Sequence, residues 1–95
     1  RKRSMIDYLI KKWQLNFGIT DWQITTEKID PNQIVYNGET YFVGIERDFE
    51  KKEGIIYHDI DLCEESIVHE LLHVQNPDKD ENWVNKKTNQ LLNLI

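Results

Sequence analysis

Residues 64–74 read EESIVHELLHV and contain two of the three histidines of the chain. Apolar residues recur through it at helical spacing and predict a helix that is buried on most of its faces. His69 and His73 are four residues apart, so both imidazoles lie on one face of this helix, one turn apart. A buried helix that carries two imidazoles on one face must supply partners for them.

The same stretch contains the pattern His69-Glu70-x-x-His73, known as HExxH. Two imidazoles at this spacing can bind one Zn²⁺, and the glutamate between them is placed to act on a water at the metal. A catalytic zinc takes three protein ligands and leaves its fourth position to water. We therefore expect His69 and His73 to be metal ligands and Glu70 to be the general base that later returns the proton to the leaving amine.

A third ligand has to come from outside the motif, and the candidates are His58, the remaining histidine, and the acids just after this helix. Residues 80–95 predict a C-terminal helix, and Glu81 lies within about 60° of its apolar stripe, facing inward. Zinc would neutralise an acid in that position, so Glu81 is our predicted ligand. Asp80 and Asp78 remain alternatives, although either could instead cap the helix. Cys63 is off the histidine face and is predicted to be a small buried residue.

The composition bounds the class of protein. The chain has 95 residues and is expected to form one domain, residues 1–95. Its net charge is −5, and outside positions 1–13 the chain has seven basic and sixteen acidic residues, which argues against nucleic acid as a partner. No apolar run is long enough for a membrane span. A single cysteine and the lack of a leader-like segment lead us to expect a cytoplasmic protein.

The remaining segments predict an α+β fold. An N-terminal helix should start after Ser4 and stop at Gly18. Strands are predicted at residues 22–26, 40–47 and 55–61, with a possible fourth at 33–36 and a charged turn at 50–54. Asp61 should cap the HExxH helix, with Glu64 reaching back to complete a capping box. The expected order is helix, three or four strands, metal helix and ligand helix.

The HExxH motif followed by an acid on the next helix resembles the zincin metallopeptidases, specifically the gluzincin type. The layout is similar to a minimal zincin of phage or bacterial type and distantly to the ImmA-type repressor-cleaving proteases. This resemblance implies a zincin-like fold, a bound Zn²⁺ and a protein or peptide substrate. The chain departs from larger gluzincins because Asn85 stands where their Glu-x-x-x-Asp motif has its aspartate, and the third histidine of metzincins is absent.

Zincins usually supply a Tyr, His or Arg that stabilises the oxyanion, and no such residue follows His73. The resemblance therefore directs attention upstream, to Tyr57 and His58, with Tyr36 and Tyr41 as further candidates. It also implies that a substrate peptide pairs with an edge strand, at residues 41–47 or 55–60.

Two functions follow from these observations. The first is a zinc-dependent peptidase, and the alternative is a non-catalytic zinc-binding domain that mediates protein–protein interaction. The upstream Glu-Gly-Cys motif of a deformylase, another HExxH hydrolase, is missing.

Overall fold

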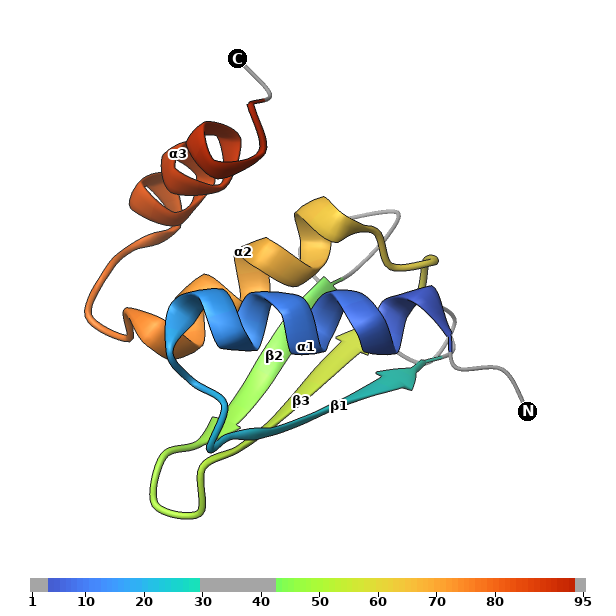
Figure 1. The fold of residues 1–95 in the computed structure, drawn as a ribbon. Coiled ribbons are helices and arrows are strands. Elements are labelled where there is room, and N and C mark those ends of the chain that lie inside the picture. The colour runs from blue at the N-terminus through green and yellow to red at the C-terminus, as the bar shows by residue number, and fades with distance from the viewer. Residues whose placement is uncertain (1–3, 30–42, 94–95) are drawn as a thin grey trace. The chain divides into compact units, whose positions relative to one another are not determined.

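The computed structural model describes residues 4–29 and 43–93 (Figure 1). Its elements in chain order are α1 (Met5–Phe17), β1 (Gln23–Lys28), β2 (Val43–Asp48), β3 (Glu53–His58), α2 (Glu64–Gln75) and α3 (Glu81–Leu92). The predicted α+β class is thus confirmed, as three helices and a mixed sheet of three strands within the described residues. The possible strand at 33–36 lies outside the described residues.

The described residues separate into two compact units. The helical unit comprises residues 4–20 and 63–93, and the sheet unit comprises residues 21–29 and 43–62. All three predicted metal ligands belong to the helical unit. No helix among the described residues has the length and apolar character needed to cross a membrane.

Helix α1 begins and ends where its local sequence predicts. The Ser4 side chain accepts a hydrogen bond from the backbone N–H of Asp7 at 3.2 Å, which satisfies one of the free donors of the first turn. Gly18 ends the helix with φ of 68°, a left-handed conformation that favours glycine because a Cβ would be strained there. Both predicted boundaries are confirmed.

Helices α1 and α2 pack side by side (Figure 1). On α1, Ile10 and Trp13 are buried, and the indole N–H of Trp13 donates to Glu64 Oε2 at 2.8 Å. Lys12 Nζ approaches the same oxygen at 3.1 Å. At the other end of the pair, Gln75 Nε2 donates to the carbonyl oxygen of Phe17 at 3.0 Å.

These contacts correct the predicted capping box of α2. The N-cap residue is Cys63, which makes no side-chain capping bond, and the Glu64 carboxylate is bonded to α1. Asp61 instead lies 3.7 Å from Lys28 Nζ within the sheet unit. The prediction was wrong because α2 begins at Glu64, which makes Glu64 the first helical residue and not the third that a capping box requires, and its carboxylate accepts from Trp13 instead.

In the sheet unit, β3 lies between its two partners in the order β1-β3-β2. Strand β1 runs parallel to β3 and β2 runs antiparallel to it, with Ile56 of β3 opposite Thr26 and Ile45 and fully buried. Strand β3 begins at Glu53, so residues 53–54 are strand where a turn was predicted. A Cβ at position 54 would lie 3.0 Å from Ile24 Cδ1, so the glycine leaves room for the Ile24 side chain against this part of the strand.

Candidate metal centre

The two motif histidines project from the same face of α2, as their spacing predicts. Their ring centroids are 5.0 Å apart. Their side chains are only 18% and 17% exposed, for His69 and His73 respectively. The neighbouring Leu71 and Leu72 are completely buried, so the backbone that carries both imidazoles is held in a packed helix.

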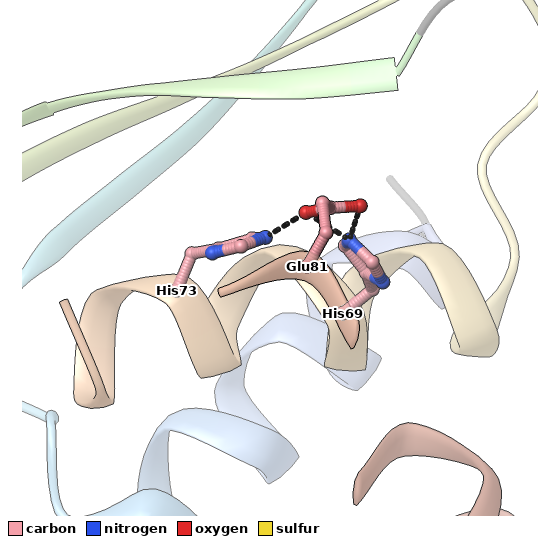
Figure 2. Close-up of side chains that lie close together, drawn as sticks. All are labelled: His69, His73 and Glu81. Atoms are coloured by element: carbon pink, nitrogen blue, oxygen red, sulfur yellow. Dashed lines mark hydrogen bonds and ion pairs between the residues drawn. The ribbon is translucent and has the colours of Figure 1, made fainter. Parts of the chain in front are cut away.

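Glu81 approaches these imidazoles from the first turn of α3. Its Oε1 atom lies 2.5 Å from His73 Nε2, and its Oε2 atom lies 3.1 Å from His69 Nε2. Figure 2 shows the carboxylate between the two rings, with an interaction to each. The ligand atoms of these three residues lie within 4.8 Å of one another. The structure therefore brings together the three side chains that the sequence proposed as ligands.

The two alternative acids have other places in the structure. Asp80 is the N-cap of α3, and its side chain accepts a hydrogen bond from the backbone N–H of Trp83 at 2.9 Å. Asp78 lies in the exposed turn before it. Within residues 4–29 and 43–93, the only group of metal-binding side chains contains Glu81 and neither aspartate. The geometry thus favours Glu81 as the third donor.

The charges at this cluster favour an ionised Glu81. Partial burial of the carboxyl raises its pKa, but the positive charge of His69 and the hydrogen bonds from His73 and His69 outweigh that effect, so the pKa is lowered overall. The attraction depends on protonated imidazoles. A bound cation would take the place of those protons, since metal ligands must be deprotonated and metal binding releases protons.

The donor set fits Zn²⁺. Zinc binds histidine nitrogen at about 2.0–2.1 Å and carboxylate oxygen at about 2.0–2.2 Å, which places tetrahedral donors roughly 3.3 Å apart. The contact of 3.1 Å between Glu81 and His69 Nε2 is close to this spacing, whereas the contact of 2.5 Å between Glu81 and His73 Nε2 is shorter and would have to open by about 0.8 Å to admit the ion. Two imidazoles and one carboxylate are also the ligand chemistry of catalytic zinc sites with one open position.

Glu70 stands beside the cluster without belonging to it. Its side chain is buried, with 5% exposed, and it is not part of the three-residue donor group. At about 100° per residue it lies roughly 60° from His73 around the helix. A buried carboxyl next to a ligand face is the environment in which general bases are found, because burial excludes competing water.

Tyr57 and His58, the proposed oxyanion donors, belong to the sheet unit, where both have partners. The Tyr57 hydroxyl donates to Glu46 Oε1 at 3.0 Å, and this bond raises the pKa of the phenol. The His58 Nδ1–H donates to the carbonyl oxygen of Ile60 at 2.6 Å. Their catalytic role stays a prediction. Tyr36 and Tyr41 lie outside the described residues.

Cys63 was predicted to be buried, and this prediction was wrong because the residue is exposed. Its Sγ atom lies 3.5 Å from Ser66 Oγ, and the residue is not part of the donor group. The exposure follows from its place as the N-cap of α2, since an N-cap residue stands outside the packed turns of its helix.

Comparison with known proteins gives no relative. No family model matches the chain, and neither a curated protein nor a solved structure matches it.

Proposed function

We propose that this protein is a zinc-dependent metallopeptidase of the HExxH type, with a protein or peptide as its substrate. The observation that supports the proposal is the convergence of His69, His73 and Glu81, from two helices, on one point of space. Three donors of this kind are what a catalytic zinc requires, and the glutamate between the histidines is the residue that such catalysis needs next to the metal.

The three ligands leave a suitable charge at the site. Two neutral imidazoles and one carboxylate supply a single negative charge, so the site would keep a net positive charge when occupied. When bound, Zn²⁺ would polarise the peptide carbonyl and lower the pKa of a water from about 15.7 toward 7. The imidazoles bind through Nε2, the atoms that already face the Glu81 carboxylate.

Glu70 performs the proton transfers in this proposal. Its carboxylate accepts a proton from the attacking water as the new C–O bond forms. It then donates that proton to the amine nitrogen as the C–N bond breaks, so the carboxylate is regenerated at the end of the cycle. Its burial keeps bulk water from taking over either transfer.

The proposal is tested with three glutamate variants of one chain, measured for zinc content and for cleavage of a broad peptide library. Glu70→Gln should keep stoichiometric zinc and lose about 10²–10⁴-fold in rate, the usual contribution of a general base. Glu81→Ala should lose both zinc and activity. Glu65→Gln is the matched control, because Glu65 is an exposed glutamate of the same helix and should behave as wild type.

The result distinguishes the two functions derived from the sequence. Wild-type protein that binds one zinc and cleaves nothing in the library would contradict the peptidase and favour the non-catalytic zinc-binding domain. The same conclusion follows if Glu70→Gln leaves an observed cleavage activity unchanged, because that activity would then not use the motif.

A further inference from the structure

Asp80, the residue that precedes the proposed ligand Glu81, bonds to the first turn of α3 through both its side chain and its backbone. Its side-chain oxygen accepts from the N–H of Trp83 at 2.9 Å, and its carbonyl oxygen accepts from the N–H of Val84 at 3.1 Å. The backbone of Asp80 is extended, with φ of −86° and ψ of 176°, as expected of an N-cap. Glu81 is therefore the first residue of a turn that Asp80 closes.

Glu81 itself is exposed. Its side chain is 66% exposed and contacts the imidazoles only through the carboxylate. The first buried residue of α3 is Val84, followed by Thr88. The turn from Glu81 to Trp83 thus lies between the cap and the packed part of the helix, at a terminus where helices ordinarily fray.

The two imidazoles are positioned differently. His69 lies in the middle of α2 and His73 in its last turn, and each has buried neighbours in the chain, Val68 beside His69 and Leu72 and Val74 beside His73. Two of the three donors are therefore held by a packed core, and the third depends on the order of one helix end. A binding site has to be held within about 0.5 Å of its productive geometry, so loosening that turn would weaken binding at the whole centre.

We infer that Asp80 is a positioning residue of the metal centre, which acts through its hydrogen bond to Trp83 to place the Glu81 carboxylate between the imidazoles. The inference rests on the proposed zinc site. It assigns Asp80 no contact with the metal, and its role depends on hydrogen-bond acceptance and not on charge. Asn and Ser accept the same bond and are equally good N-cap residues, whereas Ala cannot.

The test measures Zn²⁺ affinity and the absorption spectrum of the Co²⁺-loaded protein for Asp80→Ala, Asp80→Asn and Asp80→Ser. Asp80→Ala should bind Zn²⁺ about tenfold more weakly, the size typical of a lost cap or of a lost partner behind a metal ligand. It should also change the Co²⁺ spectrum. Asn and Ser should restore both affinity and spectrum to near the wild-type values.

Two control variants separate positioning from general effects. Ser4→Ala removes the equivalent capping bond of α1 within the same unit, away from the ligands, and should leave Zn²⁺ affinity unchanged. Asp78→Asn removes a nearby negative charge from the exposed turn without removing a cap, and should also bind as wild type.

Each other outcome overturns the inference in a recognisable way. Equal losses in Ser4→Ala and Asp80→Ala would reduce Asp80 to a contributor to global stability. Weak binding in Asp80→Asn would make its charge or direct ligation the cause, and unchanged binding in Asp80→Ala would remove its role altogether. Wild-type protein that binds neither Zn²⁺ nor Co²⁺ would overturn the metal site itself, together with the proposed peptidase.

Discussion

Helix α2 packs against two helices, α1 and α3, and the two helix pairs differ in the side chains that they bury and in their polar contacts. Its pairing with α1 buries Ile10 and Trp13 of α1 and adds hydrogen bonds at both ends. On the other side, the buried residues of α3 within the described part of the chain are Val84 and Thr88, and Glu81 makes polar contacts with both histidines of α2. One pairing resembles a protein core, whereas the other is centred on ionisable groups.

This difference indicates that the two helix pairs contribute differently to stability and to metal binding. Burial of large apolar side chains is the dominant stabilising contribution in folding, so the α1 side holds α2 in place. The α3 side contributes less buried surface and presents groups that a cation can join. A metal ion is therefore expected to act mainly on the α2–α3 pairing, and core substitutions mainly on the α1–α2 pairing.

The largest stability effect is expected from Trp13→Ala. It deletes a side chain that is 8% exposed and leaves Glu64 without its indole donor, so the free energy of unfolding should fall by about 3–5 kcal/mol. Chemical denaturation monitored by circular dichroism measures this loss. The control is Leu15→Ala on the same helix, since Leu15 is 72% exposed and should change stability by no more than about 0.5 kcal/mol. Similar losses in both variants would contradict the assigned core.

Zinc addition should have the next largest effect. A ligand that binds only the folded state at about 100 times its Kd stabilises that state by about 2.7 kcal/mol. Hydrogen exchange should show the gain in protection first in α3, because little buried surface holds that helix without the ion. Chelation should reverse the change. Protection that rises in α1 and leaves α3 unaffected would contradict the proposed location of the ion.

Val84→Ala should cost somewhat less, about 2 kcal/mol, because it removes two buried methyl groups from the α2–α3 pairing. Its distinguishing feature should be a fall in Zn²⁺ affinity, which calorimetric titration measures. An Ile10→Ala variant of α1, with a loss of stability at least as large, should leave that affinity nearly unchanged. Equal effects of both variants on affinity would show that the two pairings are not independent.

The smallest effect concerns pH and the Glu64 carboxylate. Its hydrogen bonds from Trp13 and then from Lys12 lower its pKa below the ordinary value of 4.5, although burial opposes them. A lowered folded-state pKa contributes stability that is present above pH 4.5 and is lost as the pH falls through the folded-state value. With the side chain 35% exposed, solvent screening keeps the contribution under about 1 kcal/mol.

The Glu64 prediction is checked by denaturation of wild type and Glu64→Gln at a series of pH values. The wild type should lose its advantage over the variant as the pH falls below 4.5, and the difference should stay constant above it. A constant difference over the whole range would mean that the carboxylate contributes through its shape alone.

The local features of this molecule were predictable from sequence. Ser4 and Gly18 bound α1 because the chemistry of capping and of left-handed glycine acts over a few residues. The positions of His69, His73 and Glu81 were predictable for a related reason, since helical periodicity places both histidines on one face of their helix and Glu81 near the apolar stripe of the next. The metal-ligand roles of these residues, and a zincin-like fold, remain predictions.

The errors concern partners that are distant in sequence. Glu64 was assigned to a capping box, whereas it bonds to Trp13, 51 residues earlier in the chain. Capping patterns consider only hydrogen-bond partners within one helical turn, so they cannot predict a bond to an indole on another helix. Cys63 is a different case, because it was expected to be buried on account of its residue type and is exposed at the N-cap of α2.

X-ray absorption at the zinc edge of the metal-loaded protein tests the central claim most directly. The account predicts nitrogen and oxygen ligands at about 2.0–2.2 Å, with the scattering pattern of two imidazoles, and no sulfur. In His73→Ala the contribution of one imidazole should disappear. A sulfur ligand at about 2.3 Å, or a wild-type site with fewer than two imidazoles, would contradict a centre built from His69, His73 and Glu81.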